Sequence, residues 1–167
     1  WTERSAWPVS RDTAGYLGCW LAFAVVPLLN MAYYFGFVFW WQGYARSGLT
    51  VPLAAFATLF ALTLSALALW IGTAFRSRER SAQLLLATAL PLLFLSGLSW
   101  PAEALPAPLQ WLRWLSPSTA GIQGFVALNQ LGASWHEVRT EAAVLAGLGL
   151  VALALGLPRW QIGRAHV

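Results

Sequence analysis

Residues 84–107 read LLLATALPLLFLSGLSWPAEALPA, and this stretch decides the fold. Its first part, 84–95, is an apolar run with Pro91 inside it. The chain then breaks at Pro101 and Pro106 instead of turning directly into another apolar span. Non-helical backbone at membrane depth persists only where protein covers it or where it lines a cavity. The stretch is therefore a candidate gate, and an ordinary helix end with an interfacial loop is the alternative interpretation.

An apolar, tryptophan-rich piece at 109–115 follows the break, and Ser-Pro-Ser-Thr at 116–119 closes it. Pro117 suits the first position of a helix with Ser116 as its N-cap. Beyond it, apolar residues recur at helical spacing, which predicts an amphipathic helix; these are Ile122, Phe125, Val126 and Leu131. The candidate gate residues are Ser96, Gly97, Pro101, Glu103, Pro106 and Pro117.

The composition is that of an integral membrane protein. Of the 167 residues, 59% are hydrophobic and only 10% are charged, and the mean hydropathy is +0.61. Soluble domains carry roughly 25% charged residues. All ten basic residues are arginines near the ends of apolar segments, so the net charge of +4 does not indicate nucleic-acid binding. The single cysteine, Cys19, cannot form an internal disulfide.

Four apolar segments predict an all-α, polytopic membrane helix bundle with an outer re-entrant helical segment between the last two spans. The predicted spans are residues 17–41, 51–75, 83–100 and 142–157. The second is rich in small residues that suit close helix packing. The fourth is short, at roughly 24 Å, and Pro158 is expected to end it.

Two prolines inside spans predict kinks, Pro27 in the first span and Pro91 in the third. Asn30 lies one turn beyond Pro27 and can bond a neighbouring helix or contact a substrate, of which the first is favoured. At the polar N-terminal flank, Ser10 is a candidate cap for a helix that runs into the membrane.

The arginines predict the orientation. The cluster Arg76, Arg78 and Arg80 lies between two spans and predicts a cytoplasmic loop. With four spans, both ends of the chain are then cytoplasmic and the tryptophan-rich piece is outside. The arginines assigned inside are 4, 11, 76, 78, 80 and 159, and those assigned outside are 46, 113 and 139.

The sequence lacks the residues that several other kinds of membrane protein require. No charged residue falls within a predicted span, whereas ion-coupled carriers usually need one. No nucleophile–base pair or metal-ligand set is present, and His136 is expected to lie alone at the interface. No phosphate-binding loop exists, and there is no lysine to build one. These absences disfavour an integral membrane enzyme and predict no catalytic residue, metal or bound cofactor. Any conformational change of the helix bundle must therefore be driven by another subunit.

The break at Pro101 and Pro106 and the residues around it resemble the signature of type-2 ABC exporter permeases. The matching residues are Ser-Gly-Leu-Ser-Trp-Pro at 96–101, Pro106, Leu-Gln at 109–110 and Ser-Pro-Ser-Thr at 116–119. The arginine cluster and Pro-Val-Ser at 8–10 are also similar to that family. The resemblance implies that residues 1–160 are the C-terminal part of a six-span permease domain, lacking the first two spans, in the plasma (inner) membrane.

The resemblance also implies partners. An ATPase subunit would bring ATP and Mg, and a second permease copy would complete a homo- or heterodimer in the lipid bilayer. Arg11, Arg76, Arg78 and Arg80 would face the ATPase. The implied function is ATP-driven export of a hydrophobic or amphiphilic substrate, and the alternative is a non-transporting membrane scaffold or assembly protein. A neighbouring ATPase gene would favour the exporter.

The last residues, 161–167, are expected to be a sequence scar and not structural. Ile-Gly-Arg-Ala-His-Val at 162–167 matches the translation of a common sequencing-adapter read. These residues are therefore left out of the predicted permease domain.

Overall fold

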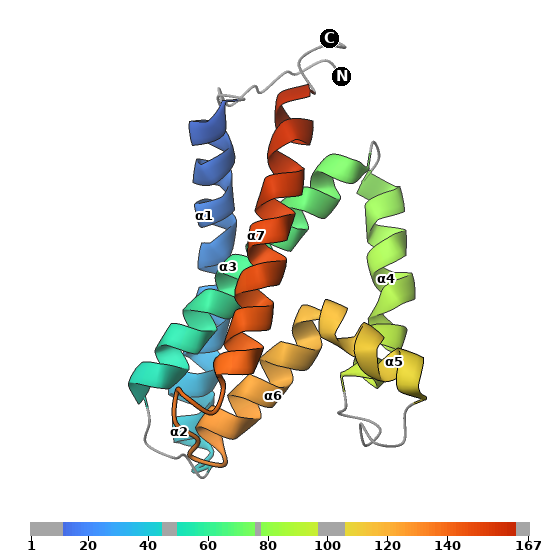
Figure 1. Cartoon of the computed structure of the whole chain (residues 1–167). Coiled ribbons are helices and arrows are strands. Elements are labelled where there is room, and N and C mark those ends of the chain that lie inside the picture. The colour runs from blue at the N-terminus through green and yellow to red at the C-terminus, as the bar shows by residue number, and fades with distance from the viewer. Residues whose placement is uncertain (1–11, 45–49, 76–77, 97–105, 163–167) are drawn as a thin grey trace.

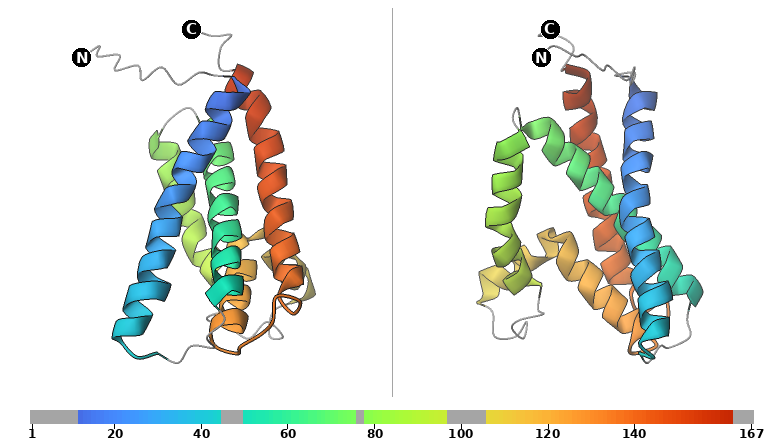
Figure 2. Two further views of the ribbon diagram at one scale, coloured as in Figure 1. Left: turned by 90° about the vertical axis from the view of Figure 1, so that its left-hand side faces the viewer. Right: turned by 180° about the vertical axis from the view of Figure 1, so that it is seen from behind.

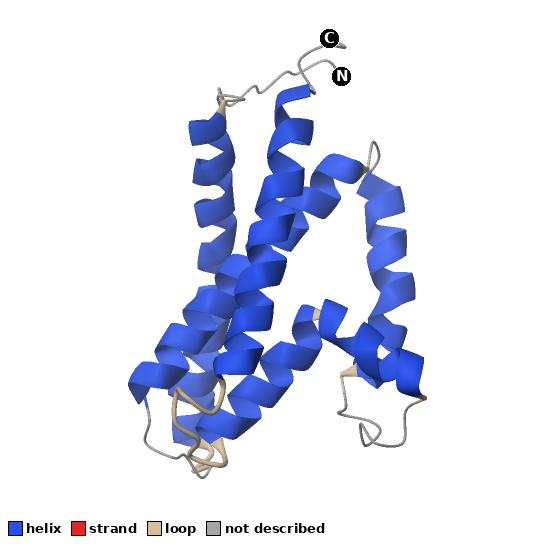
Figure 3. Ribbon diagram, viewed as in Figure 1, coloured by secondary structure: helices blue, strands red, loops and turns tan. Residues whose placement is uncertain are grey.

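The computed structural model describes residues 12–44, 50–75, 78–96 and 106–162. Within these ranges all regular secondary structure is helical (Figure 3). Three helices are long and apolar enough to cross a membrane, Thr13–Trp41, Val51–Ala74 and Arg139–Gln161, and a shorter apolar helix covers Ala82–Leu95. The predicted all-α membrane fold is therefore confirmed, whereas a count of four spans stays a prediction.

The first membrane helix is a continuous rod made of α1 (Thr13–Met31), η1 (Ala32–Val38) and α2 (Phe39–Trp41). It begins at Thr13 rather than at residue 17 because Asp12 caps it. The Asp12 carboxylate accepts a hydrogen bond of 2.8 Å from the Gly15 N–H, and an acidic cap also suits the positive end of the helix dipole. Ser10, the cap predicted from the sequence, lies outside the described residues.

The middle of this rod, η1, is a π-helix, which no pattern in the sequence predicted. The wider turn of a π-helix is evident from the hydrogen bond at the end of η1, where the Phe39 N–H donates to the Tyr34 carbonyl five residues earlier. π-helices are rare and often mark functional sites. Pro27 lies inside α1 without ending it, so the kink expected there stays a prediction.

α3 (Thr50–Ala74) is the centre of the fold, and its bounds agree with the predicted span to within one residue. It packs against α1, α6 and α7 (Figures 1 and 2). The buried residues of α3 include Ala57, Ala61 and Ala66, which confirms that small side chains let neighbouring helices approach closely. The indole Nε1 of Trp20 donates to the Leu62 carbonyl at 2.9 Å and joins α1 to α3.

A buried threonine joins α3 to α7 (Arg139–Ile162). The Thr63 Oγ1 lies 2.9 Å from the Leu145 carbonyl of α7 and 3.0 Å from the Leu59 carbonyl of its own helix. Gly149 permits this approach, since a Cβ added there would lie 3.2 Å from the Thr63 Oγ1. The hydroxyl is therefore within hydrogen-bond distance of a carbonyl on each helix of the pair.

Valine at Thr63 is expected to destabilise the α3–α7 pair by about 0.6–1.7 kcal/mol, the range for interhelical hydrogen bonds in membranes. SDS titration of the purified full permease in mixed micelles measures this as an earlier unfolding midpoint. Thr88→Val is the matched control, because the Thr88 hydroxyl bonds only carbonyls of its own helix, Leu84 and Leu85. Equal midpoints for the two variants would contradict the interhelical role.

α4 (Arg78–Leu95) stands to one side of α1, α3 and α7 and contacts α5 and α6 (Figures 1 and 2). Residues 78–80 form its first turn, so the predicted loop is wrong for them; an acidic Glu79 suits a helix start. The helix ends at Leu95 instead of residue 100. The Ser96 N–H bonds the Leu92 carbonyl at 3.0 Å and its hydroxyl bonds the Leu93 carbonyl at 2.6 Å, which closes the last turn.

Two short helical pieces lead into the next helix. α5 (Ala107–Leu112) and η3 (Arg113–Leu115) lead from one end of the bundle towards its middle. α6 (Pro117–Asn129) begins there and runs back towards the same end (Figures 1 and 2). Pro117 occupies the first position of α6 after an extended Ser116, as predicted. The Ser116 hydroxyl, however, makes no capping hydrogen bond.

The loop before α7 contains a pair not expected from the sequence. His136 is not alone, since the Arg139 Nη1 lies 3.0 Å from its Nε2; an arginine can only donate, so the ring nitrogen accepts. In the same loop the Ser134 N–H and hydroxyl donate to the Glu137 carboxylate, which lowers the pKa of that group. Gly132 turns the chain with a φ of 70°.

α7 is longer than the predicted span, and Pro158 lies inside it rather than ending it. Proline removes one backbone hydrogen bond of a helix, and this loss is tolerated near the helix end, where the freed carbonyl can meet water. Twenty-four residues span roughly 36 Å, because α7 adds turns with Arg139, Glu141 and Arg159 to the apolar stretch; that this stretch is short stays a prediction.

The helix ends fall into two groups. The start of α1, the end of α7 and the junction of α3 with α4 lie at one end of the bundle, and the start of α7 lies at the other (Figures 1 and 2). Arg80 and Arg159 therefore belong to one end and Arg139 to the opposite end. This separation matches the sides to which the sequence assigned them.

Candidate functional site

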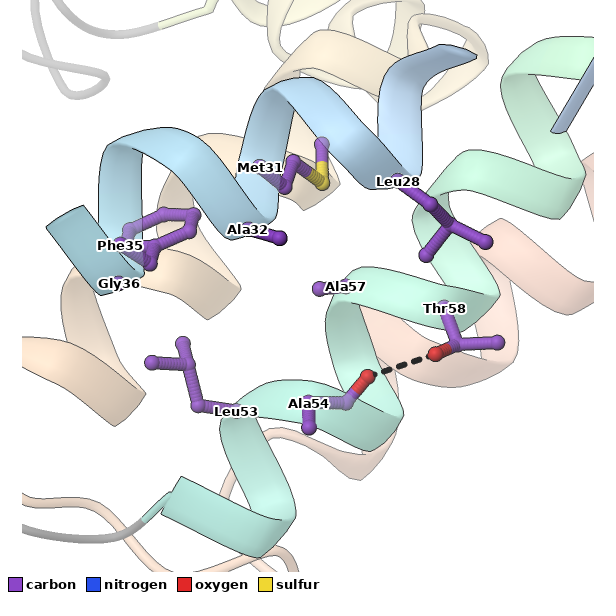
Figure 4. A pocket seen from close by; sticks show the side chains of 9 residues that line it. All are labelled: Leu28, Met31, Ala32, Phe35, Gly36, Leu53, Ala54, Ala57 and Thr58. Carbon is purple, nitrogen blue, oxygen red and sulfur yellow. Dashed lines mark hydrogen bonds between the residues drawn. The ribbon is translucent and has the colours of Figure 1, made fainter. Parts of the chain in front are cut away.

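The first candidate site is a cavity of about 370 Å³ between the α1–η1 rod and α3 (Figure 4). The rod contributes Leu28, Met31, Ala32, Phe35 and Gly36, and α3 contributes Leu53, Ala54, Ala57 and Thr58. The only polar side chain among them is Thr58, and its hydroxyl already donates to the Ala54 carbonyl at 2.8 Å. The lining therefore suits an apolar group and has no free side-chain donor for a polar one.

A second cavity, of about 380 Å³, lies where the same rod meets α6. Met31 and Phe35 line both cavities, so the two flank η1 and the turn before it. The second lining is also largely apolar, but it includes three residues with polar side chains, Asn30, Tyr34 and Ser118. Together the cavities present apolar and polar groups on neighbouring faces of one helix, which is the pattern an amphiphile needs.

An aromatic cluster holds the rod, α3 and α6 together beside these cavities. The Phe125 ring of α6 stacks on Phe35 of η1 with centroids 4.9 Å apart. It also makes edge contacts with Phe56 at 5.1 Å and Phe60 at 5.5 Å, both on α3. One ring therefore fixes the position of the π-helix relative to two other helices.

Two glycines of α6 receive the α3 rings. A Cβ added at Gly121 would lie within 2.9 Å of three atoms of the Phe60 ring, and one at Gly124 within 2.8 Å of three atoms of Phe56. The buried face of α6 is accordingly built mainly from small residues, together with Leu128 and Asn129. The face expected from apolar spacing is correct only in part: Phe125 packs against α3 and η1, but Val126 and Leu131 are exposed, because lipid accepts large apolar side chains and the helix contact needs small ones.

The start of α6 gathers buried polar atoms. Ser116 is 3% exposed and Thr119 is fully buried, and neither hydroxyl has a hydrogen-bond partner. The half-buried Arg113 has two guanidinium nitrogens, Nε and Nη1, that are buried without a partner. Its guanidinium lies 5.3 Å from the centre of the Trp114 ring, a cation–π contact.

The comparison with known families decides the identity of this bundle. A family model described as ABC-2 family transporter protein matches residues 12–157. The chain belongs to the ABC-2 transporter family. Comparisons with curated proteins and with solved structures found no significant match. The chain is therefore a membrane component of an ABC transporter system, which works with an ATPase partner and is not itself the ATPase.

The structure places only part of the permease gate predicted from the sequence. Ser96 closes α4 and is buried, and Pro106 precedes α5 with its carbonyl accepting from the N–H groups of Leu109 and Gln110 at 2.9 and 3.1 Å. Pro117 begins α6, which contacts α4. Gly97, Pro101 and Glu103 lie outside the described residues.

The other predicted permease residues are spread over the bundle. Arg80 lies in the first turn of α4, and of Arg78 only the backbone is described. Asn30 lines the second cavity, and Pro91 is an exposed residue inside α4. Arg11 and Arg76 lie outside the described residues. Within the described ranges no group of three histidine, cysteine or acidic residues is placed to hold a metal ion.

Sequence reasoning missed the aromatic cluster and the glycines that receive it. A usable signal was present, because Phe56 and Phe60 are four residues apart and Gly121 and Gly124 are three apart. Residues at these spacings share one face of a helix. Two large rings on one helix and two glycines on another predict an interlocking contact once the helices are known to be neighbours.

Proposed function

We propose that the chain is the permease subunit of an ATP-driven exporter that moves a hydrophobic or amphiphilic substrate outward across the plasma membrane. The observation that carries this proposal is the turn from α5 into α6, which begins part-way along the height of the bundle and runs back to the end opposite Arg80 and Arg159 (Figures 1 and 2). A helix pair of this shape forms a re-entrant segment if the bundle spans the bilayer.

In this proposal α4 is the third of four spans. Its apolar part, Ala82–Leu95, covers roughly 21 Å, less than a bilayer core of about 30 Å. Tilting of the neighbouring helices or local thinning of the bilayer accommodates such a mismatch. The outer re-entrant segment then follows α4 directly, as the family resemblance implies.

The ATPase partner would bind the end of the bundle at which α4 begins with Arg78 and Arg80. The sequence assigns Arg11 and Arg76 to the same side, which is cytoplasmic by the distribution of arginines. ATP and Mg would be bound by that partner. A second permease copy, identical or related, would complete the transporter. Closure of the ATPase subunits would tilt the helices at Pro27 and Pro91 and open the break at residues 96–106.

The substrate class follows from the cavities beside η1. Neither lining contains a charged side chain, and the first offers no free side-chain donor. An alkyl or aromatic group would therefore gain contacts there without leaving a buried charge unpaired. Asn30, Tyr34 and Ser118 on the second cavity would accept the polar part of an amphiphile.

Alanine at both Pro101 and Pro106 tests the gate. Each proline restricts the chain by about 0.4–1 kcal/mol, so losing both should shift a two-state gate about fivefold or more. The measurement is ATP-dependent movement of a fluorescent amphiphile in inside-out vesicles carrying the full permease and its ATPase partner. Pro158→Ala is the control, because Pro158 lies in α7, away from the gate. Unchanged transport with normal insertion would remove the gate assignment.

Cysteine labelling tests the orientation. In a background with Cys19 replaced by serine, Arg80→Cys should react with an impermeant maleimide only in inside-out vesicles, and Trp111→Cys only in right-side-out vesicles. Both side chains are exposed, Trp111 at 80%. Labelling of residue 80 from outside would reverse the topology and exclude the ATPase from the arginine end.

A further inference from the structure

The turn between α5 and α6 holds three polar residues in two successive tight turns. The Ser116 N–H donates to the Arg113 carbonyl at 3.1 Å, and the Thr119 N–H donates to the Ser116 carbonyl at 3.2 Å. These two hydrogen bonds place Arg113, Ser116 and Thr119 in the turns that lead into the N-terminus of α6, a helix of 13 residues.

Within the described residues, most side-chain polar atoms of this group have no hydrogen-bond partner. The hydroxyls of Ser116 and Thr119 are both buried and unbonded, although an N-cap serine normally accepts from the first turn of its helix. Two of the three guanidinium nitrogens of Arg113 are likewise buried and unbonded. Buried donors without partners are costly, and a buried positive charge without one is costlier.

Three contributions at this turn favour a negative charge. The guanidinium carries a full positive charge, the hydroxyls of Ser116 and Thr119 can donate, and the N-terminus of α6 carries the positive end of the helix dipole. Helix N-termini with such surroundings bind phosphate and carboxylate groups. The guanidinium lies 5.3 Å from the centre of the Trp114 ring, so a cation–π contact holds it beside this turn.

We propose that Arg113, Ser116, Thr119 and the N-terminus of α6 form a binding site for a phosphate group, and that it takes the anionic head of an amphiphile. The inference rests on the proposed function, because the position of α6 within the bilayer makes a lipid-like ligand accessible to it. The site complements the cavities beside η1, whose linings contain no charged side chain: they suit the apolar and uncharged polar parts of a substrate, and Arg113 suits its anionic head.

Lipid retention tests the site independently of transport. The full permease with its ATPase partner is placed, without ATP, in nanodiscs of phosphatidylcholine with a minor fraction of phosphatidylglycerol, and retained lipid is counted by native mass spectrometry. Arg113→Gln should lower phosphatidylglycerol retention about tenfold, the loss expected for one charge-assisted hydrogen bond. Arg113→Lys should keep part of it, and Ser116→Ala should give a smaller loss. The exposed Arg139, changed to Gln, is the control for charge alone.

Adding inorganic phosphate distinguishes the two sources of the anion. Displacement of phosphatidylglycerol shows that free phosphate suffices, and no displacement shows that the lipid head is required; either result supports the site. Equal retention by the Arg113→Gln and Arg139→Gln variants would overturn it. So would a Glu141→Gln variant that reproduces Arg113→Gln, because the buried, unpaired Oε2 of Glu141 would then be the natural partner of the arginine. If the permease retained phosphatidylglycerol through Arg113 but exported no substrate, only the proposed function would be refuted.

Discussion

Alanine in place of Gly124 is expected to destabilise the folded permease by about 1–3 kcal/mol, the usual cost of overpacking a close contact. The added methyl group would meet the ring of Phe56, which is fully buried and edge-on to Phe125. Neither ring can move without disturbing the contact between α3 and α6. SDS titration of the purified full permease, followed by its tryptophan fluorescence, measures the shift.

Gly147→Ala is the matched control for this substitution. Gly147 lies inside α7, and a Cβ added there meets nothing within 4 Å. Since alanine is the better helix former by roughly 0.5–1 kcal/mol, this variant should be neutral or slightly more stable. The pair therefore separates steric conflict from helix propensity, and equal behaviour of the two variants would show that Phe56 does not occupy the Gly124 contact.

Removing the Phe125 ring is expected to cost about 3 kcal/mol, because it ends three aromatic contacts worth roughly 1 kcal/mol each. The loss should also release η1 from α6, since the stacking of Phe35 on Phe125 joins the π-helix to α6. Phe125→Ala should therefore shift the SDS midpoint and increase hydrogen exchange in residues 32–38. Mass spectrometry of the exchanged peptides measures the second effect.

Two further variants make this prediction specific. Phe125→Leu keeps most of the volume without the ring and should show an intermediate shift. Phe23→Ala removes a ring that is 55% exposed on α1 and should leave the exchange of η1 unchanged. If Phe125→Ala changed stability no more than Phe23→Ala, the cluster would not be what holds the rod against α3 and α6.

The helices themselves were largely predictable, because length and apolarity determine which segments cross a membrane. The second span was placed to within one residue, and Pro117 was correctly placed at a helix start. Prolines were less informative near helix ends: Pro158 was expected to stop α7, which continues past it. The start of α4 inside the arginine cluster was also missed, since charged residues near a span end predict sidedness and not the point where the helix begins.

By itself the sequence determined that the chain is an α-helical membrane protein, where two of its spans lie and that Arg80 and Arg159 share the end opposite Arg139. Only the tertiary structure decided which faces meet: the glycines of α6 against Phe56 and Phe60, the π-helix against Phe125, and the unpaired Arg113 at the start of α6. The physical reason is the solvent. In water apolar periodicity identifies the buried face, but lipid is as apolar as the side chains, so shape and hydrogen bonding select the contacts instead.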